Sequence, residues 1–277
     1  MYIQGVKLTH NHPKLATAAM RYALISDIHA NLPALDAVLA DIRGRAAIGA
    51  VYHLGDLVGY APWPNQVVQR IQAEAICGVA GNYDSTVATH YKHCGCRSED
   101  ARQERLSHES YEWTLKQVSV ETAQFLAGLP FRIDVRPFGG HMSGPRLVLV
   151  HAHTSNNLIY VEENRPDSFL SKMAAAAGLA AGDVLAFGHT HKPWHREVDG
   201  VHFVNTGSVG RPKDGDCRAG YVVLDFSNDT VDVEFVRVEY DVGAATQAIM
   251  SSELPNEFAE FLRTGGKLPV IANGEST

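Results

Sequence analysis

Seven side chains that can bind a divalent metal ion occur in short polar turns spread over the chain. In sequence order they are Asp27, His29, Asp56, Asn82, His151, His189 and His191. Mixed carboxylate, imidazole and amide-oxygen ligands suit manganese, iron or zinc better than magnesium or calcium, which prefer oxygen alone. Seven ligands exceed what one ion needs. The set therefore indicates two divalent metal ions, a pair that stabilises both the attacking and the leaving oxygen in phosphoryl displacement.

Each of these turns follows a short apolar run that we predict to be a β-strand. The runs occupy residues 21–26, 50–54, 75–81, 146–150 and 183–187. Apolar residues at helical spacing follow the first two runs, at 32–45 and 64–74, so the early chain alternates between strand and helix. This alternation predicts an α/β fold. In open α/β sheets ligands gather beyond the carboxyl ends of the strands, so residues remote in sequence can share one site.

The rest of the chain divides into segments with different patterns. Further strands are expected at 131–135, 201–205, 220–226 and 231–238, and helices at 167–179 and 242–263, the latter interrupted at Pro255. We expect residues 1–19 to be an N-terminal extension, with Met20 as the natural start; an ordered extension packed on the domain is the alternative. Residues 20–241 would form one domain, and residues 85–121 a lid-like insertion over the sheet edge with a helical run at 110–118. Residues 242–277 would form a helical segment and tail that pack on the core or supply a homodimer surface.

Composition narrows the possible partners. The chain has 277 residues, of which 45% are hydrophobic and 20% charged, as in soluble globular proteins. A net charge of -7 argues against binding of long nucleic acid, which usually requires a basic face. Neither a membrane-spanning segment nor a signal peptide is evident, and the four cysteines do not form a disulfide framework, so we expect a cytoplasmic protein. His90, His93, Cys94 and Cys96 could in principle bind a structural zinc ion, but four ligands within seven residues cannot easily form a tetrahedron, so we expect Cys94 and Cys96 to be reduced thiols.

The ordered set of motifs is more specific than any one of them. Asp-x-His at 27–29, Gly-Asp at 55–56, Gly-Asn-x-Asp at 81–84, His151 and Gly-His-x-His at 188–191 each follow an apolar strand. In this order the chain resembles the calcineurin-like metallophosphoesterases from Met20 to Val238. The Asn-x-Gly-Ser turn at 205–208 is similar to that of the bacterial small phosphodiesterase and diadenosine-tetraphosphatase-like branch.

The resemblance implies a fold and a division of the metal ligands. The fold would be a four-layer αββα sandwich with two mixed β-sheets and the metal ions at the strand ends. Asp56 would bridge the two ions. Four residues would hold the first ion, namely Asp27, His29, Asp56 and His191, and four the second, namely Asp56, Asn82, His151 and His189.

The expected mechanism is attack on phosphorus by a metal-bound hydroxide, with Asp56 and Asn82 in the catalytic centre. Many members of the family have histidine after the asparagine, where this chain has Tyr83, a poorer proton donor at neutral pH. That departure favours leaving groups that need little protonation, unless His153 supplies the proton. Asp84 is expected to orient a ligand histidine. The candidate substrate contacts are Asn31, Asn205 and Arg211.

These expectations favour an enzyme over other classes of protein. We expect hydrolysis of phosphodiester or phosphoanhydride bonds in a small or nucleotide-like substrate. A phosphomonoesterase or protein phosphatase is the alternative within the enzymes, and a non-catalytic metal-binding scaffold the alternative outside them. An amidohydrolase barrel is disfavoured because the first strand leads to Asp-x-His and not to His-x-His.

Overall fold

Two five-stranded mixed sheets form the centre of the protein in the computed structural model, which describes residues 20–96, 100–138, 144–227 and 230–267. The first sheet has the order β10-β9-β1-β2-β3, in which β1, β2 and β3 are parallel. Its strands are β1 (Met20–Ile25), β2 (Ile48–His53), β3 (Cys77–Gly78), β9 (Ala219–Ser227) and β10 (Thr230–Val238). The expected extension at 1–19 lies outside the described residues.

The second sheet has the order β4-β5-β6-β8-β7, with β5, β6 and β8 parallel and the two edge strands antiparallel to them. Its strands are β4 (Arg132–Val135), β5 (Leu147–Val150), β6 (Val184–Phe187), β7 (Trp194–Val198) and β8 (Val201–Asn205). Parallel central strands with antiparallel edges make both sheets mixed. The predicted strands were therefore largely correct in type and position.

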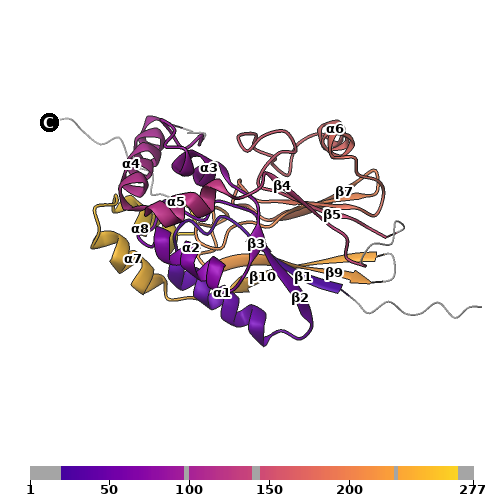
Figure 1. Ribbon diagram of the computed structural model, residues 1–277, viewed down its shortest axis with the longest axis horizontal. Coiled ribbons are helices and arrows are strands. Elements are labelled where there is room, and N and C mark those ends of the chain that lie inside the picture. The colour runs from indigo at the N-terminus through magenta and orange to yellow at the C-terminus, as the bar shows by residue number, and fades with distance from the viewer. Residues whose placement is uncertain (1–19, 97–99, 139–143, 228–229, 268–277) are drawn as a thin grey trace, which may run out of the picture.

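Helices cover the outer face of each sheet, so that four layers result (Figure 1). Those on the side of the first sheet are α1 (Leu32–Gly44), α2 (Pro64–Ala73), α3 (Asn82–Ala88), α4 (Ala101–Gln117), α5 (Val120–Ala127), α7 (Val242–Met250) and α8 (Glu257–Arg263). The second sheet is covered by α6 (Asp167–Ala177). This is the expected four-layer αββα sandwich.

Side-chain alternation along the strands explains why the sheets stack. In β1, Tyr22 and Leu24 pack between the sheets, whereas Ala23 and Ile25 pack against the helices. Residues of β5 alternate in the same way between the central layer and the layer under α6. Since successive side chains of a strand point to opposite faces, a strand that is apolar throughout must be covered on both sides.

One strand and two helices were not predicted from the sequence. β7 forms a hairpin with β8 around Asp199 and Gly200, whose φ angles of 52° and 75° fit a tight turn that favours the Asp-Gly pair. That dipeptide was the available signal. The segment at 85–121, predicted as a lid-like insertion, contains the end of α3, all of α4 and the start of α5.

The structure corrects the prediction of reduced thiols, because Cys94 and Cys96 form a disulfide. Gly95 between them has a φ of 74°, and this reversal brings the two Cα atoms to 5.4 Å. Cys77 and Cys217 are free. No helix within the described residues is long and apolar enough to cross a membrane.

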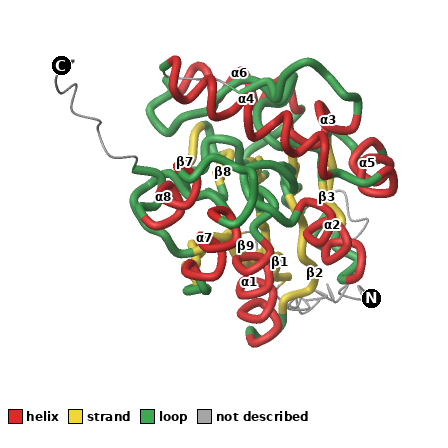
Figure 2. The backbone as a smooth tube through the Cα atoms, turned by 90° about the vertical axis from the view of Figure 1, so that its left-hand side faces the viewer, coloured by secondary structure: helices red, strands yellow, loops and turns green. Residues whose placement is uncertain are grey.

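The C-terminal helices pack on the domain. Phe258 and Leu262 of α8 are buried in the core shared with α1 and the first sheet, and α7 contacts α1. Figure 2 turns the loop-rich end of the sheets toward the viewer, with α4 above and α8 to the left of the central loops. The functional residues predicted from the sequence lie at this end.

Candidate metal centre and adjoining pocket

The two sheets bring all seven candidate metal ligands to the same end of the sandwich. Asp27 and His29 follow β1, Asp56 follows β2, Asn82 begins α3 after β3, His151 follows β5, and His189 and His191 follow β6. Two groups of three have ligand atoms within 4.8 Å of one another: the first is Asp27, His29 and His191, and the second is Asp56, His151 and His189. All six of these residues are buried.

Backbone strain accompanies this convergence. Asp27, His29, Asp56, His189 and His191 have φ angles between 48° and 67°, in the left-handed region that non-glycine residues rarely occupy. Cross-links between loops hold this conformation: the Asp27 amide donates to the Gly55 carbonyl at 3.0 Å, and the His29 amide to the Asp56 carbonyl, also at 3.0 Å. Residues in such strained positions cluster at functional sites.

Each of the two carboxylates has one oxygen fixed by hydrogen bonds and one directed at histidines. Oδ2 of Asp27 accepts from the His189 amide at 2.9 Å and from Ser26 Oγ at 2.6 Å, whereas its buried Oδ1 has no hydrogen-bond partner among the described residues. That free Oδ1 lies 3.2 Å from Nε2 of His191. The arrangement leaves one carboxylate oxygen available for a cation.

The carboxylate of Asp56 is held by a hydrogen bond in the same manner, and it faces both groups of candidate metal ligands. Its Oδ1 accepts from the Tyr83 amide at 2.9 Å. Its Oδ2 lies 3.7 Å from Nε2 of His29 and 3.6 Å from Nε2 of His151. A single carboxylate oxygen of Asp56 thus faces one histidine of each group.

Carbonyl contacts fix the tautomers of three histidines. Nδ1 of His29 lies 3.0 Å from the Val58 carbonyl, Nδ1 of His151 lies 2.7 Å from the Leu54 carbonyl, and Nδ1 of His191 lies 2.6 Å from the Arg211 carbonyl. A carbonyl only accepts, so each Nδ1 carries the proton. Each Nε2 then presents a lone pair, provided the ring is neutral.

The pKa shifts indicate that two of these rings are neutral. Burial lowers the pKa of His29 well below its usual value and lowers that of His191 to about 4. Their Nε2 atoms are 3.2 Å apart with no proton between them. Burial also raises the pKa of the Asp56 carboxyl to about 8, whereas Asp56 and Asp27 raise the pKa of the neighbouring His151. The facing lone pairs of His29 and His191 beside buried carboxyl groups fit bound cations.

Asn82 and His189 complete the second group. Nδ1 of His189 lies 3.2 Å from Nε2 of His151, and Oδ1 of Asn82 lies 3.1 Å from the same atom. The Asn82 amide donates to the Cys94 carbonyl at 2.9 Å, which turns its oxygen toward the histidines. The disulfide segment therefore orients this amide.

Asp84 acts on a loop and not on a ligand histidine. Its carboxylate accepts from the amides of Leu57 at 2.8 Å and Gly81 at 3.0 Å, and so ties the turn after Asp56 to the start of α3. The histidines are oriented by backbone carbonyls instead. The expected role of Asp84 thus changes from orienting a ring to fixing the loop that carries Asp56.

Two residues expected near the proton transfer are directed elsewhere. The Tyr83 side chain is fully buried, and its hydroxyl donates to Ser110 Oγ at 3.1 Å; burial raises its pKa well above 10. His153 is hydrogen-bonded to Ser155 and does not line the pocket beside the metal ligands. Neither is a suitable proton donor in this structure, because one is held by α4 and the other lies outside the pocket.

Asn31 and Asn205 are occupied by structural hydrogen bonds. Asn31 caps α1 and donates to the Gly210 carbonyl at 2.9 Å, and Asn205 donates to the Gly188 carbonyl at 2.8 Å while accepting from the Gly207 amide. Both are fully buried. We therefore do not retain them as substrate contacts.

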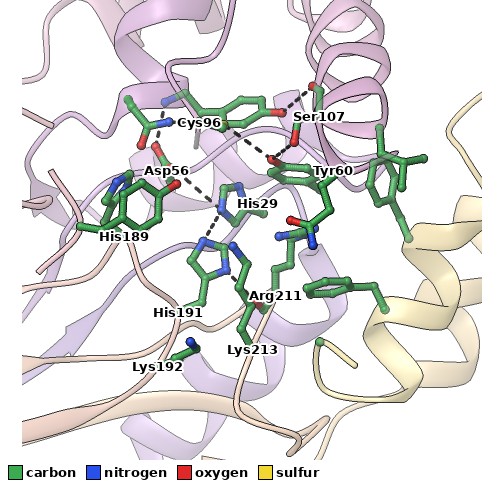
Figure 3. Close-up of a pocket in the computed structure, with 18 of the residues that line it drawn as sticks. His29, Asp56, Tyr60, Cys96, Ser107, His189, His191, Lys192, Arg211 and Lys213 are labelled. Carbon is green, nitrogen blue, oxygen red and sulfur yellow. Dashed lines mark hydrogen bonds and ion pairs between the residues drawn. The ribbon is translucent and has the colours of Figure 1, made fainter. Parts of the chain in front are cut away.

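A pocket of about 230 Å³ lies over the candidate ligands (Figure 3). Arg211, which was predicted, lines it together with residues that sequence reasoning missed. The missed residues are Tyr60, Cys96, Gln103, Leu106, Ser107, Tyr160, Lys192, Lys213, Glu257, Phe258, Phe261 and Gly266. Lys213 lies in the same turn as Arg211, so the pattern that indicated Arg211 could also have indicated Lys213. The residues of α4 and α8 gave no signal, because only folding brings these helices over the strand ends.

Comparison with known proteins gives a consistent result. A model of the calcineurin-like phosphoesterase superfamily domain matches residues 20–229. An uncharacterized protein of Methanocaldococcus jannaschii is 32% identical over 88% of this chain and 97% of its own. Phosphodiesterase YfcE of Escherichia coli is 27% identical over 77% of this chain and 91% of its own. The crystal structure of a metallophosphoesterase from Sphaerobacter thermophilus matches with a TM-score of 0.69 at 28% identity, covering 89% of this chain and 99% of that one.

Proposed function

Because the chain belongs to the calcineurin-like phosphoesterase superfamily, we propose that it hydrolyses phosphodiester or phosphoanhydride bonds of small or nucleotide-like substrates with two divalent metal ions. Manganese, iron and zinc suit the mixed ligands. The observation that carries the proposal is the convergence of two buried carboxyl groups, four imidazoles and one amide oxygen at the ends of the strands.

The division of ligands proposed here follows the two groups. Asp27, His29 and His191 would hold one ion, Asn82, His151 and His189 the other, and Asp56 would be shared. When bound, the ions would withdraw charge from the phosphate oxygens and lower the pKa of the attacking water molecule. The protein's own part is to hold both carboxylates and the three Nδ1-protonated histidines in place through backbone contacts.

The pocket supports a small substrate with an anionic group. Arg211, Lys192 and Lys213 line it together with aromatic side chains, and α4 and α8 bound it. The small volume of this pocket, about 230 Å³, favours a small substrate over a folded phosphoprotein. Since neither Tyr83 nor His153 is available as a proton donor, leaving groups that depart without protonation, such as a nucleotide phosphate or an aryl oxide, fit best.

The test combines metal analysis with a panel of substrates: an aryl phosphomonoester, an aryl phosphodiester, a diadenosine polyphosphate and short single-stranded DNA. We expect about two metal ions per chain and manganese-stimulated turnover of the diester or the polyphosphate. Asp56→Asn should abolish turnover, whereas Asp232→Asn, which changes an exposed carboxylate on β10, should leave it unchanged. Faster turnover of the monoester would contradict the choice of bond. Failure to hydrolyse any phosphoester with metal bound would favour a scaffold.

A further inference from the structure

Arg211 has an unusual environment within the pocket. The centre of its guanidinium group lies 3.9 Å from the ring centroid of Tyr60 and 3.9 Å from that of Phe261, so two aromatic rings lie close to it. Phe258 is further away, at 5.9 Å. Cation–π contacts of this kind are strongest where water is excluded, and burial lowers the pKa of Arg211.

The edge of this guanidinium group has no protein acceptor. Within the described part of the chain, the group makes no hydrogen bond and no ion pair, although Arg211 lines the pocket. Guanidinium carries five N–H donors in one plane and pairs with oxyanions through two of them. A half-buried cation without an acceptor is costly, so the edge is suited to an anion that enters the pocket.

The two rings come from different parts of the chain. Tyr60 belongs to the loop after β2, whereas Phe261 belongs to α8, which lies beyond the residues 20–229 matched by the family model. α8 is held in place by its buried Phe258 and Leu262, by the Gly215 amide donating to the Gly265 carbonyl at 2.8 Å, and by an ion pair of Glu257 with Arg102 of α4 at 3.6 Å.

The guanidinium also lies close to the metal ligands. The backbone carbonyl of Arg211 accepts from Nδ1 of His191 at 2.6 Å, and Arg211 lines the same pocket as His29 and His191. Figure 3 shows Arg211 beside His29, His191 and Lys213. A phosphate group at the ligands would therefore be within the field of this cation.

We propose that α8 is part of the substrate site, and that Phe261 is a positioning residue which, with Tyr60, holds the Arg211 guanidinium so that its edge receives an oxygen of the substrate phosphate. This inference rests on the proposed function. An arginine side chain loses rotamer entropy when it is ordered, and contact with two rings orders it before the anion arrives. The ligand class is a phosphate-type oxyanion.

The test measures binding of inorganic phosphate to the manganese-loaded full-length protein by calorimetry, and needs no turnover. Phe261→Leu should weaken phosphate binding about 3- to 30-fold, the range expected for loss of a cation–π contact. Arg211→Met should weaken it at least as much. In the Arg211→Met background, Phe261→Leu should have no further effect, because the ring then has no cation to position. Phe261→Trp, which keeps an aromatic face, should retain binding.

Leu262→Ala is the matched control, since Leu262 lies on the same helix, is buried like Phe261, and packs in the core. It should lower the melting temperature but leave phosphate affinity within about twofold. The inference would be overturned if Leu262→Ala weakened phosphate binding as much as Phe261→Leu does. It would also be overturned if Phe261→Leu weakened phosphate binding equally in the wild-type and Arg211→Met backgrounds. Should Phe261→Leu not fold, Tyr60→Leu applies the same test from the opposite ring.

The outcomes separate the two proposals. Phosphate affinity that depends on Phe261 only through Arg211, in a protein that hydrolyses no phosphoester, would refute the proposed function and leave α8 as part of an anion site. Turnover of a phosphoester, together with a phosphate affinity that does not change in Phe261→Leu, would support the proposed function and refute the role of α8.

Discussion

Gly81→Ala tests the placement of Asp56 without altering any candidate ligand. Gly81 has φ and ψ angles of -84° and 179°, which alanine also adopts, so the substitution adds a methyl group without backbone strain. A Cβ at this position would lie 2.0 Å from Oδ1 of Asp56 and 2.3 Å from its backbone nitrogen. The perturbation is therefore steric and is directed at the carboxylate proposed to be shared by both ions.

The size of the effect follows from the displacement required. Real Cβ contacts are essentially never shorter than 3.0 Å, so Asp56 must move by about 1 Å. A misplacement of about 1 Å at a catalytic centre lowers rates roughly 100-fold, and overpacking costs about 1–3 kcal/mol of stability. We expect kcat to fall by about that factor and the metal content per chain to decrease.

The assay is turnover of the aryl phosphodiester in excess manganese, with metal content and unfolding by urea measured on the same samples. Gly44→Ala is the control, because a Cβ at Gly44 meets no atom within 4 Å. It should leave activity unchanged and stabilise the end of α1 by up to about 1 kcal/mol. A Gly81→Ala protein that is folded and retains full activity and two ions per chain would refute the role given to Asp56.

Two further predictions concern stability. Asp84→Asn replaces one of two buried acceptors with a donor, so an amide of Leu57 or Gly81 loses its partner; urea unfolding should show a loss of about 1–3 kcal/mol, and an unchanged midpoint would contradict it. Burial lowers the pKa of His53 to about 3, and in the unfolded chain it is about 6.5, so the unfolded state binds the extra proton and stability falls as the pH decreases below 6.5. Between pH 7 and pH 5 this histidine should contribute a loss of about 2 kcal/mol, and His53→Leu should show a correspondingly flatter dependence in urea unfolding at the two pH values.

The sequence allowed the strand-end residues to be predicted because their positions are local. Each candidate ligand stands within a few residues of the end of an apolar strand, and parallel strands end at the same edge of a sheet. No long-range information is needed to expect that Asp27 and Asp56 approach each other. The same reasoning gave the order of strands and helices, apart from the short β7 and the helices α3 and α5.

The directions of side chains, and the pocket residues contributed by distant helices, were harder to predict from the sequence. Tyr83 directly follows a candidate ligand, yet its hydroxyl is held by Ser110 of α4. Asn31 and Asn205 have residue types suited to phosphate contacts, but buried backbone groups nearby use their hydrogen-bonding capacity. Phe261 lines the pocket because α8 packs there, and this tertiary contact leaves no local pattern in the sequence.

The left-handed backbone at five candidate ligands limits which mutations this site can accept during evolution. Each such residue costs on the order of 1–3 kcal/mol, and a domain is stabilised by only about 5–15 kcal/mol in total. Glycine would remove that cost at each position but could not coordinate a cation. The chain thus keeps ligand side chains at positions where glycine would give a more stable fold. Substitutions that raise the free energy of unfolding at these positions would remove ligands, whereas bound ions would restore the stability that the strained residues cost.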